Sequence, residues 1–112
     1  MSKEIKVIIK HPGQDPFEAT IDNTLESCQA VVGGYIECVT LTSDICLVCN
    51  EEGRLLNLPE NCKVFGRPFV GTVFLVGYNS EGEFVDFPFS IRILNEFKLL
   101  APYNDDRGDT NE

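Results

Sequence analysis

The chain has 112 residues and a mass of 12.5 kDa, a size that fits one compact domain. Hydrophobic residues make up 43% and charged residues 24%, which excludes a wholly disordered chain, a collagen-like chain and a coiled coil. Nine basic against 18 acidic residues give a net charge of −9, which opposes direct binding to nucleic acid or to an anionic membrane surface.

The first two elements form a predicted β-hairpin. Ile5, Val7 and Ile9 alternate with more polar neighbours, and the alternation returns over residues 17–21. The segment 11–16 between these runs holds two prolines and a glycine, a composition typical of a loop. The sequence therefore predicts two paired strands that turn one face toward the core.

A short helix is predicted next, from about Thr24 to Val32. Asn23 and Glu26 have the N-cap and N3 spacing of a capping box, in which each side chain satisfies a free backbone amide. Gly33 can adopt the left-handed conformation that ends a helix. Because about ten residues are too few for a helix that is stable alone, we expect it to pack on a sheet.

The chain from residue 35 onward has the composition of β-strands. Runs at 35–41 and 44–49 are separated by Thr42-Ser43, which predicts a tight hairpin. Segment 55–61 is predicted to be irregular because Pro59 cannot donate to a central ladder. The most apolar stretch, residues 70–77, is predicted to be the central strand.

A turn at 79–82, a strand at 83–87 and a C-terminal helix within 91–100 complete the predicted elements. The fold class is therefore α+β, with a mostly antiparallel sheet of five or six strands and one short helix packed across it. We expect residues 1–103 to form a single domain. Residues 104–112 hold four acidic residues, one arginine and nothing apolar, and are predicted to form a disordered acidic tail. The tripeptide Arg107-Gly108-Asp109 within this tail is interpreted as chance.

No catalytic or metal-binding motif stands out. The five cysteines are odd in number and scattered, which is typical of reduced thiols, and we expect them to be buried and structural. Cys46 and Cys49 have CxxC spacing, but on a strand they would point to opposite faces, so no metal is expected. His11, the one histidine, is expected to be an exposed loop residue. We therefore expect no enzyme and no cofactor.

A cluster of polar residues surrounds Pro59 within otherwise apolar sequence. Irregular backbone beside strands is where ligand-binding groups concentrate, which makes the cluster a candidate site. The alternative is that its asparagines hydrogen-bond turns and its arginines pair with Glu51, Glu52 or Glu60. The cluster consists of Asn50, Arg54, Asn57, Asn61 and Arg67.

Five short motifs occur in order between Lys6 and Gly77. Together they resemble a family of small uncharacterised proteins, a domain of unknown function carried by phages and mobile elements of Gram-positive gut bacteria. The stretch after Phe87 departs from this pattern. The motifs are Leu25-Glu26-Ser27, Val32-Gly33-Gly34-Tyr35-Ile36-Glu37, Asn50-Glu51-Glu52-Gly53, Leu58-Pro59 with Asn61, and Val70-Gly71-Thr72.

The resemblance implies a phage-type accessory protein that counters host defence. We expect a cytoplasmic protein of the bacterial host cell that binds and sequesters a small nucleotide-derived immune signal without catalysis. Tyr35 is expected to join the polar cluster as a ligand-binding residue. Such sites often lie at an oligomer interface, so a homo-oligomer fits this expectation. The alternative is a protein–protein inhibitor or a DNA mimic that acts on a host defence protein through its acidic surface.

Overall fold

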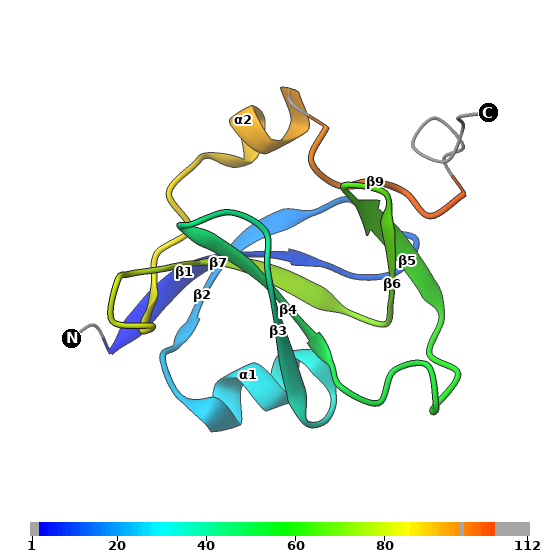
Figure 1. The fold of residues 1–112 in the computed structure, drawn as a ribbon, viewed down its shortest axis with the longest axis horizontal. Helices are drawn as coiled ribbons and strands as arrows, with labels where there is room; N and C mark the ends of the chain where they lie inside the picture. Colours follow the sequence, from blue (N-terminus) through cyan, green and yellow to red (C-terminus); the bar gives the residue numbers. More distant parts are fainter. Residues whose placement is uncertain (1–2, 97, 105–112) are drawn as a thin grey trace.

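A computed structural model describes residues 3–96 and 98–104 and confirms the α+β fold class (Figure 1). Its main sheet is antiparallel and has the strand order β2-β1-β7-β4-β3, with β8 paired to the end of β7. The central strand is thus β7, as the apolar run had indicated. The strands of this sheet are β1 (Glu4–Lys10), β2 (Phe17–Asp22), β3 (Ile36–Thr40), β4 (Ile45–Asn50), β7 (Val73–Tyr78) and β8 (Phe84–Val85).

A second, smaller sheet lies over the main one, and the sequence had not indicated it. Its strand order is β6-β5-β9, with all neighbours antiparallel. The strands are β5 (Glu60–Val64), β6 (Arg67–Val70) and β9 (Ala101–Pro102), and the two helices are α1 (Leu25–Val32) and α2 (Ile91–Glu96).

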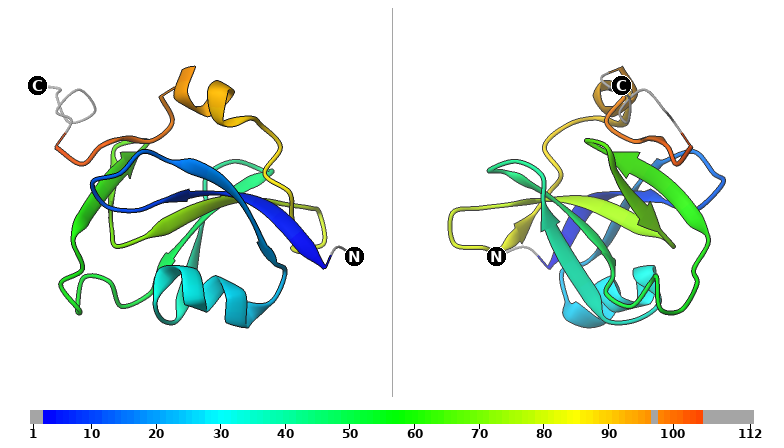
Figure 2. Two further views of the ribbon diagram at one scale, coloured as in Figure 1. Left: turned by 180° about the vertical axis from the view of Figure 1, so that it is seen from behind. Right: turned by 45° about the vertical axis from the view of Figure 1, so that its right-hand side comes forward.

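Both faces of the main sheet are buried at its centre, along β4 and β7. Side chains of β7 alternate between the two cores, with Val73 and Leu75 on one face and Phe74 and Val76 on the other. One face packs against α1, and the opposite face packs against the second sheet and α2 (Figure 2). Because both faces of β4 and β7 are buried, the sequences of these two strands are continuously apolar instead of alternating between apolar and polar residues.

Helix α1 begins one residue later than the capping box predicted. Thr24 is the N-cap residue, and its hydroxyl oxygen accepts a hydrogen bond from the backbone N–H of Ser27. Asn23 instead donates its amide to the carbonyl of Phe84 at 3.2 Å, which ties the helix entry to β8. The helix ends as predicted, because Gly33 has a φ of 82° and its N–H donates to the carbonyl of Gln29.

The predicted central strand at 70–77 had the wrong start. Val70 belongs to β6 of the second sheet, and the chain crosses to the main sheet at Gly71, which has a φ of 73°. The predicted irregular segment at 55–61 ends early, because β5 already begins at Glu60. The predicted strand at 83–87 is reduced to Phe84–Val85, and the predicted C-terminal helix spans Ile91–Glu96.

The predicted acidic tail, including its Arg107-Gly108-Asp109 tripeptide, lies outside the described residues from position 105 onward. Neither helix of the described part is long and apolar enough to cross a membrane.

Cys46 and Cys49 lie on opposite faces of β4, as their strand spacing predicted, because Cys46 belongs to one core and Cys49 to the other. Replacing both by alanine should lower the free energy of unfolding by about 1–3 kcal/mol through lost packing. Urea unfolding of the variant and the parent protein measures this difference. One equivalent of bound zinc in the parent protein, with unfolding on chelation, would contradict a purely structural role.

Candidate ligand-binding cleft

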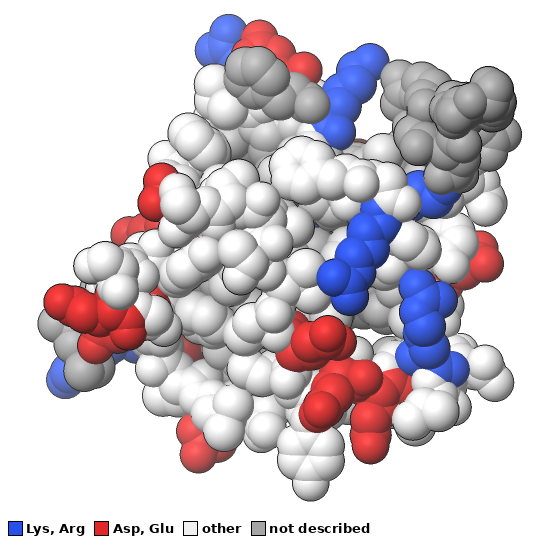
Figure 3. All heavy atoms as spheres, in the orientation of Figure 1, with Lys and Arg blue, Asp and Glu red and all other residues white. Residues whose placement is uncertain are grey.

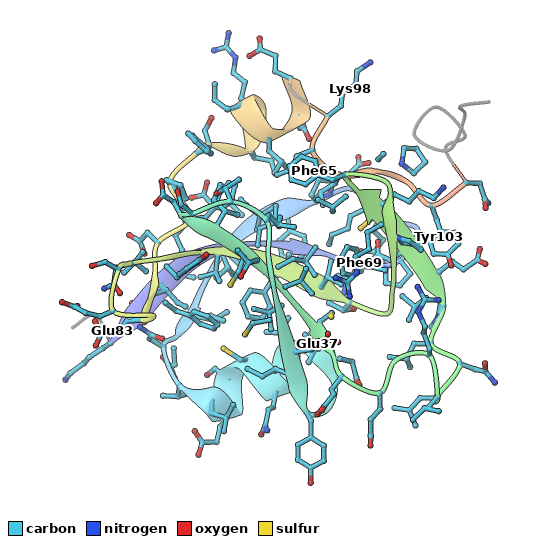
Figure 4. All side chains as sticks on the ribbon, in the orientation of Figure 1. Glu37, Phe65, Phe69, Glu83, Lys98 and Tyr103 are labelled. Atoms are coloured by element: carbon cyan, nitrogen blue, oxygen red, sulfur yellow. The ribbon has the colours of Figure 1, made fainter. Side chains whose placement is uncertain are left out.

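A cleft opens between the edges of the two sheets, where the second sheet does not fully cover the main one. Its walls come from β3, the end of β4, the turn that follows β4, and β6, and its volume is about 290 Å³. Figure 4 labels Glu37 of β3 and Phe69 of β6, one from each of the two sheets. The lining residues are Glu37, Cys49, Asn50, Glu51, Gly53, Arg54, Leu55, Arg67, Pro68, Phe69 and Val70.

Arg54 lies on the turn after β4 and reaches across to β6. Its Nη2 donates a hydrogen bond to the carbonyl of Pro68 at 3.1 Å. This carbonyl lies on a strand at the edge of the second sheet. A guanidinium carries five N–H donors, so this bond to β6 leaves further donors for a ligand.

Arg67 stands at the start of β6 with its guanidinium over the Phe69 ring, 5.4 Å from the ring centroid. Its Nη2 lies 3.9 Å from Oε2 of Glu37, which is close enough for an ion pair but too far for a hydrogen bond. The pairing differs from the predicted partners Glu51, Glu52 and Glu60, because β3 and not the turn lies opposite Arg67. Both side chains are about half exposed, so water screens the pair.

Asn50 also lines the cleft, but its amide is used inside the fold. Its Nδ2 donates to the carbonyl of Val32, and its Oδ1 accepts from the backbone N–H of Glu52 at 2.8 Å. The residue is 6% exposed. Asn50 therefore shapes the wall of the cleft by joining the end of α1 to the turn that carries Arg54.

Asn61 does not line the cleft. Its Nδ2 donates to the carbonyls of Lys10 and Gly71 at 2.8 and 2.6 Å, and its Oδ1 accepts from Nζ of Lys10 at 3.0 Å. These contacts join β5 to the end of β1 and to the crossing at Gly71. The side chain thus holds the second sheet against the first.

Tyr35 and Asn57 lie outside the lining of the cleft as well. Tyr35 is 65% exposed and immediately precedes β3. Asn57 is exposed in a turn and has a φ of 55°, a left-handed conformation that asparagine tolerates better than most residues. The structure therefore brings together three of the six predicted site residues, namely Asn50, Arg54 and Arg67.

His11 is half-buried, which corrects the prediction of an exposed loop residue. Its Nδ1 lies 2.8 Å from Oγ1 of Thr72, and its ring lies 5.6 Å from the ring of Phe17. The loop folds back on the segment before β7, so the imidazole serves as a contact between these two segments.

Cys38 is exposed, which corrects the prediction that all five thiols are buried. It pairs with Val48 across the β3–β4 ladder, and Cys46, which pairs with Thr40, is its diagonal neighbour on β4. A hydrogen bond from the Cys46 thiol lowers the pKa of Cys38 to about 7. Within the described part of the chain, no three His, Cys, Asp or Glu side chains lie close enough together to hold a metal ion.

The cleft combines groups of both charges, and Figure 3 shows basic and acidic side chains side by side on this face. Arg54 and Arg67 can donate to phosphate or carboxylate oxygens. Glu37 and Glu51 can accept from amino or ring N–H groups of the same ligand. Sequence reasoning missed Glu37 because it lies in a strand, away from the irregular segment where the polar cluster was found.

Comparison with known proteins matches residues 5–98 to the model of a domain of unknown function, DUF3846. The matched region runs past Phe87, so the departure from the family that was expected after Phe87 is wrong as far as residue 98, and residues 99–112 lie outside the match. Neither the curated proteins nor the solved structures contain a match to this chain.

Replacing Asn61 by alanine should lower the free energy of unfolding by about 2–4 kcal/mol, because the carbonyls of Lys10 and Gly71 lose a donor and the Lys10 ammonium loses one of its two acceptors. The matched control is Glu60→Ala, one position away at an exposed site. Urea unfolding measures both variants. Equal stability of the two variants would mean that Asn61 does not hold the sheets together.

The rate at which iodoacetamide alkylates folded protein should rise with pH through a midpoint near 7, since the thiolate of Cys38 is the nucleophile. Cys38→Ser should remove this fast reaction, and Cys46→Ala should move the midpoint up because the stabilising hydrogen bond is lost. Mass spectrometry of quenched samples follows the reaction. A midpoint near 9 in the parent protein would show that Cys46 has no influence.

Proposed function

The chain belongs to this family of unknown function, and we propose that it is a non-catalytic protein that binds a small nucleotide-derived ligand in the cleft. One observation carries the proposal. Two arginines with free N–H donors and two carboxylates line the same opening between the sheets. A nucleotide offers the complementary groups, because its phosphate accepts hydrogen bonds and its base donates them.

The size of the cleft narrows the class of ligand. Small-molecule sites usually have volumes of about 300–1,000 Å³, and this cleft of about 290 Å³ lies just below that range. One nucleotide unit suits that volume better than a long oligonucleotide does. The net charge of −9 further disfavours a nucleic-acid polymer, whereas the two local arginines suffice for a single phosphate group.

The arrangement of the arginines favours ligand binding. Arg54 is anchored to the Pro68 carbonyl and Arg67 lies over Phe69, so both guanidinium groups are held in place before a ligand arrives. Such preorganisation lowers the entropy cost of binding. A protein of this kind acts by withdrawing its ligand from solution. In the proposed setting of a phage, the ligand is a nucleotide immune signal of the host.

The proposal is tested with nucleoside monophosphates, cyclic mononucleotides and cyclic dinucleotides, each beside its parent nucleoside. A nucleotide that binds the folded state should raise the melting temperature in a saturable manner, while the nucleoside should not. Arg67→Gln should weaken binding about tenfold or more, since a charge-assisted hydrogen bond to phosphate is lost. Arg92→Gln, an identical change at an exposed position on α2 away from the cleft, is the matched control.

Chromatography of the bound fraction should recover the nucleotide unchanged, which tests the absence of catalysis. A panel that leaves the melting temperature unmoved overturns the proposal. Recovery of a defence protein in stable complex with the chain would then favour the inhibitor alternative.

A further inference from the structure

Strand β3 forms an edge of the main sheet, and its outer side has no neighbouring strand among the residues described (Figure 1). Two hydrogen bonds fix which backbone groups face outward. Glu51 N–H donates to the Tyr35 carbonyl at 2.8 Å, and Leu41 N–H donates to the Ile45 carbonyl at 2.9 Å. Because inward and outward groups alternate along an antiparallel strand, the outward N–H and C=O groups belong to Ile36, Cys38 and Thr40.

This edge lacks the protection that other edges of the molecule have. The edge strand β6 contains Pro68, whose carbonyl is already bound by Arg54. The opposite edge of the main sheet, β2, presents the exposed acidic side chains Glu18 and Asp22. Strand β3 contains no proline, no lysine and no bulge, devices that usually prevent edge-to-edge pairing, and its one charged side chain, Glu37, is paired with Arg67 of β6.

We propose that β3 pairs antiparallel with β3 of a second copy of this chain, about a two-fold axis at Cys38. In this register Cys38 lies opposite the partner's Cys38, and Ile36 lies opposite the partner's Thr40. All three outward-facing residues of the strand then exchange backbone hydrogen bonds with the second copy. If the axis is moved by one residue to Glu37, Thr40 has no pairing partner within β3 of the second copy. If it is moved to Val39, Ile36 has none.

The side chains of the strand complement one another in this register. Glu37 falls opposite the partner's Val39, so the two carboxylates do not face each other directly. An axis at Glu37 would place them directly opposite, which is destabilising. Tyr35, 65% exposed in the single chain, falls opposite the partner's Leu41 and gains an apolar neighbour. This match of the strand with itself selects a second copy over an unrelated extended peptide.

Long-range charge gives the pairing a distinct signature. Each chain has a net charge of −9, so two copies repel each other and added salt should tighten the pair by screening. A complex with a basic peptide would weaken in salt instead.

The oligomeric state is measured by sedimentation equilibrium of the full chain in reducing buffer, without nucleotide, over a range of protein and salt concentrations. The measured mass should approach twice 12.5 kDa as the protein concentration rises. At higher salt concentration, the dimer should form at a lower protein concentration. Cys38→Pro removes an outward N–H and leaves the inward bonds to β4 intact, so it should keep the chain folded but monomeric. Cys38→Ser, which retains the backbone donor, should remain dimeric.

Amide hydrogen exchange tests the register without any substitution. The amides of Ile36, Cys38 and Thr40 should become protected only as the dimer forms, whereas those of Glu37 and Val39 are protected at every concentration. A chain that stays monomeric to millimolar concentration overturns the proposal. A dimer in which the three outward amides still exchange freely overturns it too, because that dimer uses another surface.

Discussion

The burial of β7 on both of its faces is the constraint on which the remaining structure depends. Val73 and Leu75 need cover on one side of the main sheet, and Phe74 and Val76 need it on the other. Helix α1 supplies one cover, and the small sheet with α2 supplies the other. The chain must therefore leave the main sheet after β4 and return to it for β7, and the left-handed Gly71 makes that return possible.

The cleft is a direct result of this incomplete second layer. Three short strands cannot span the width of the main sheet, so an opening remains between the edge strands β3 and β6. Asn61 fixes the position of the small sheet through Lys10 and Gly71, and Asn50 fixes the turn that bears Arg54. The two buried asparagines thus set the position of the two arginines without contacting a ligand themselves.

Features that depend on local periodicity could be predicted from the sequence. The helix ending at Gly33 and the opposite orientation of Cys46 and Cys49 follow from the spacing of residues within one element. The small sheet could not be predicted, because β6 has only four residues, one of them Pro68, and β9 has two. The cluster around Pro59 located Arg54 and Arg67, but the partners of Asn61 depend on which distant strands meet.

The strand order also determines when the chain can fold during its synthesis. Strands β1 and β2 form one hairpin and β3 and β4 form another, and β7 inserts between them, with Ile8 pairing with Leu75. Both hairpins leave the ribosome well before β7 does. Until β7 is synthesised, the apolar edges formed by β1 and β4 have no strand beside them. Such non-local pairing slows folding and lets the waiting edges of β1 and β4 meet each other instead. The timing of one strand therefore decides whether the growing chain completes its core or closes without it.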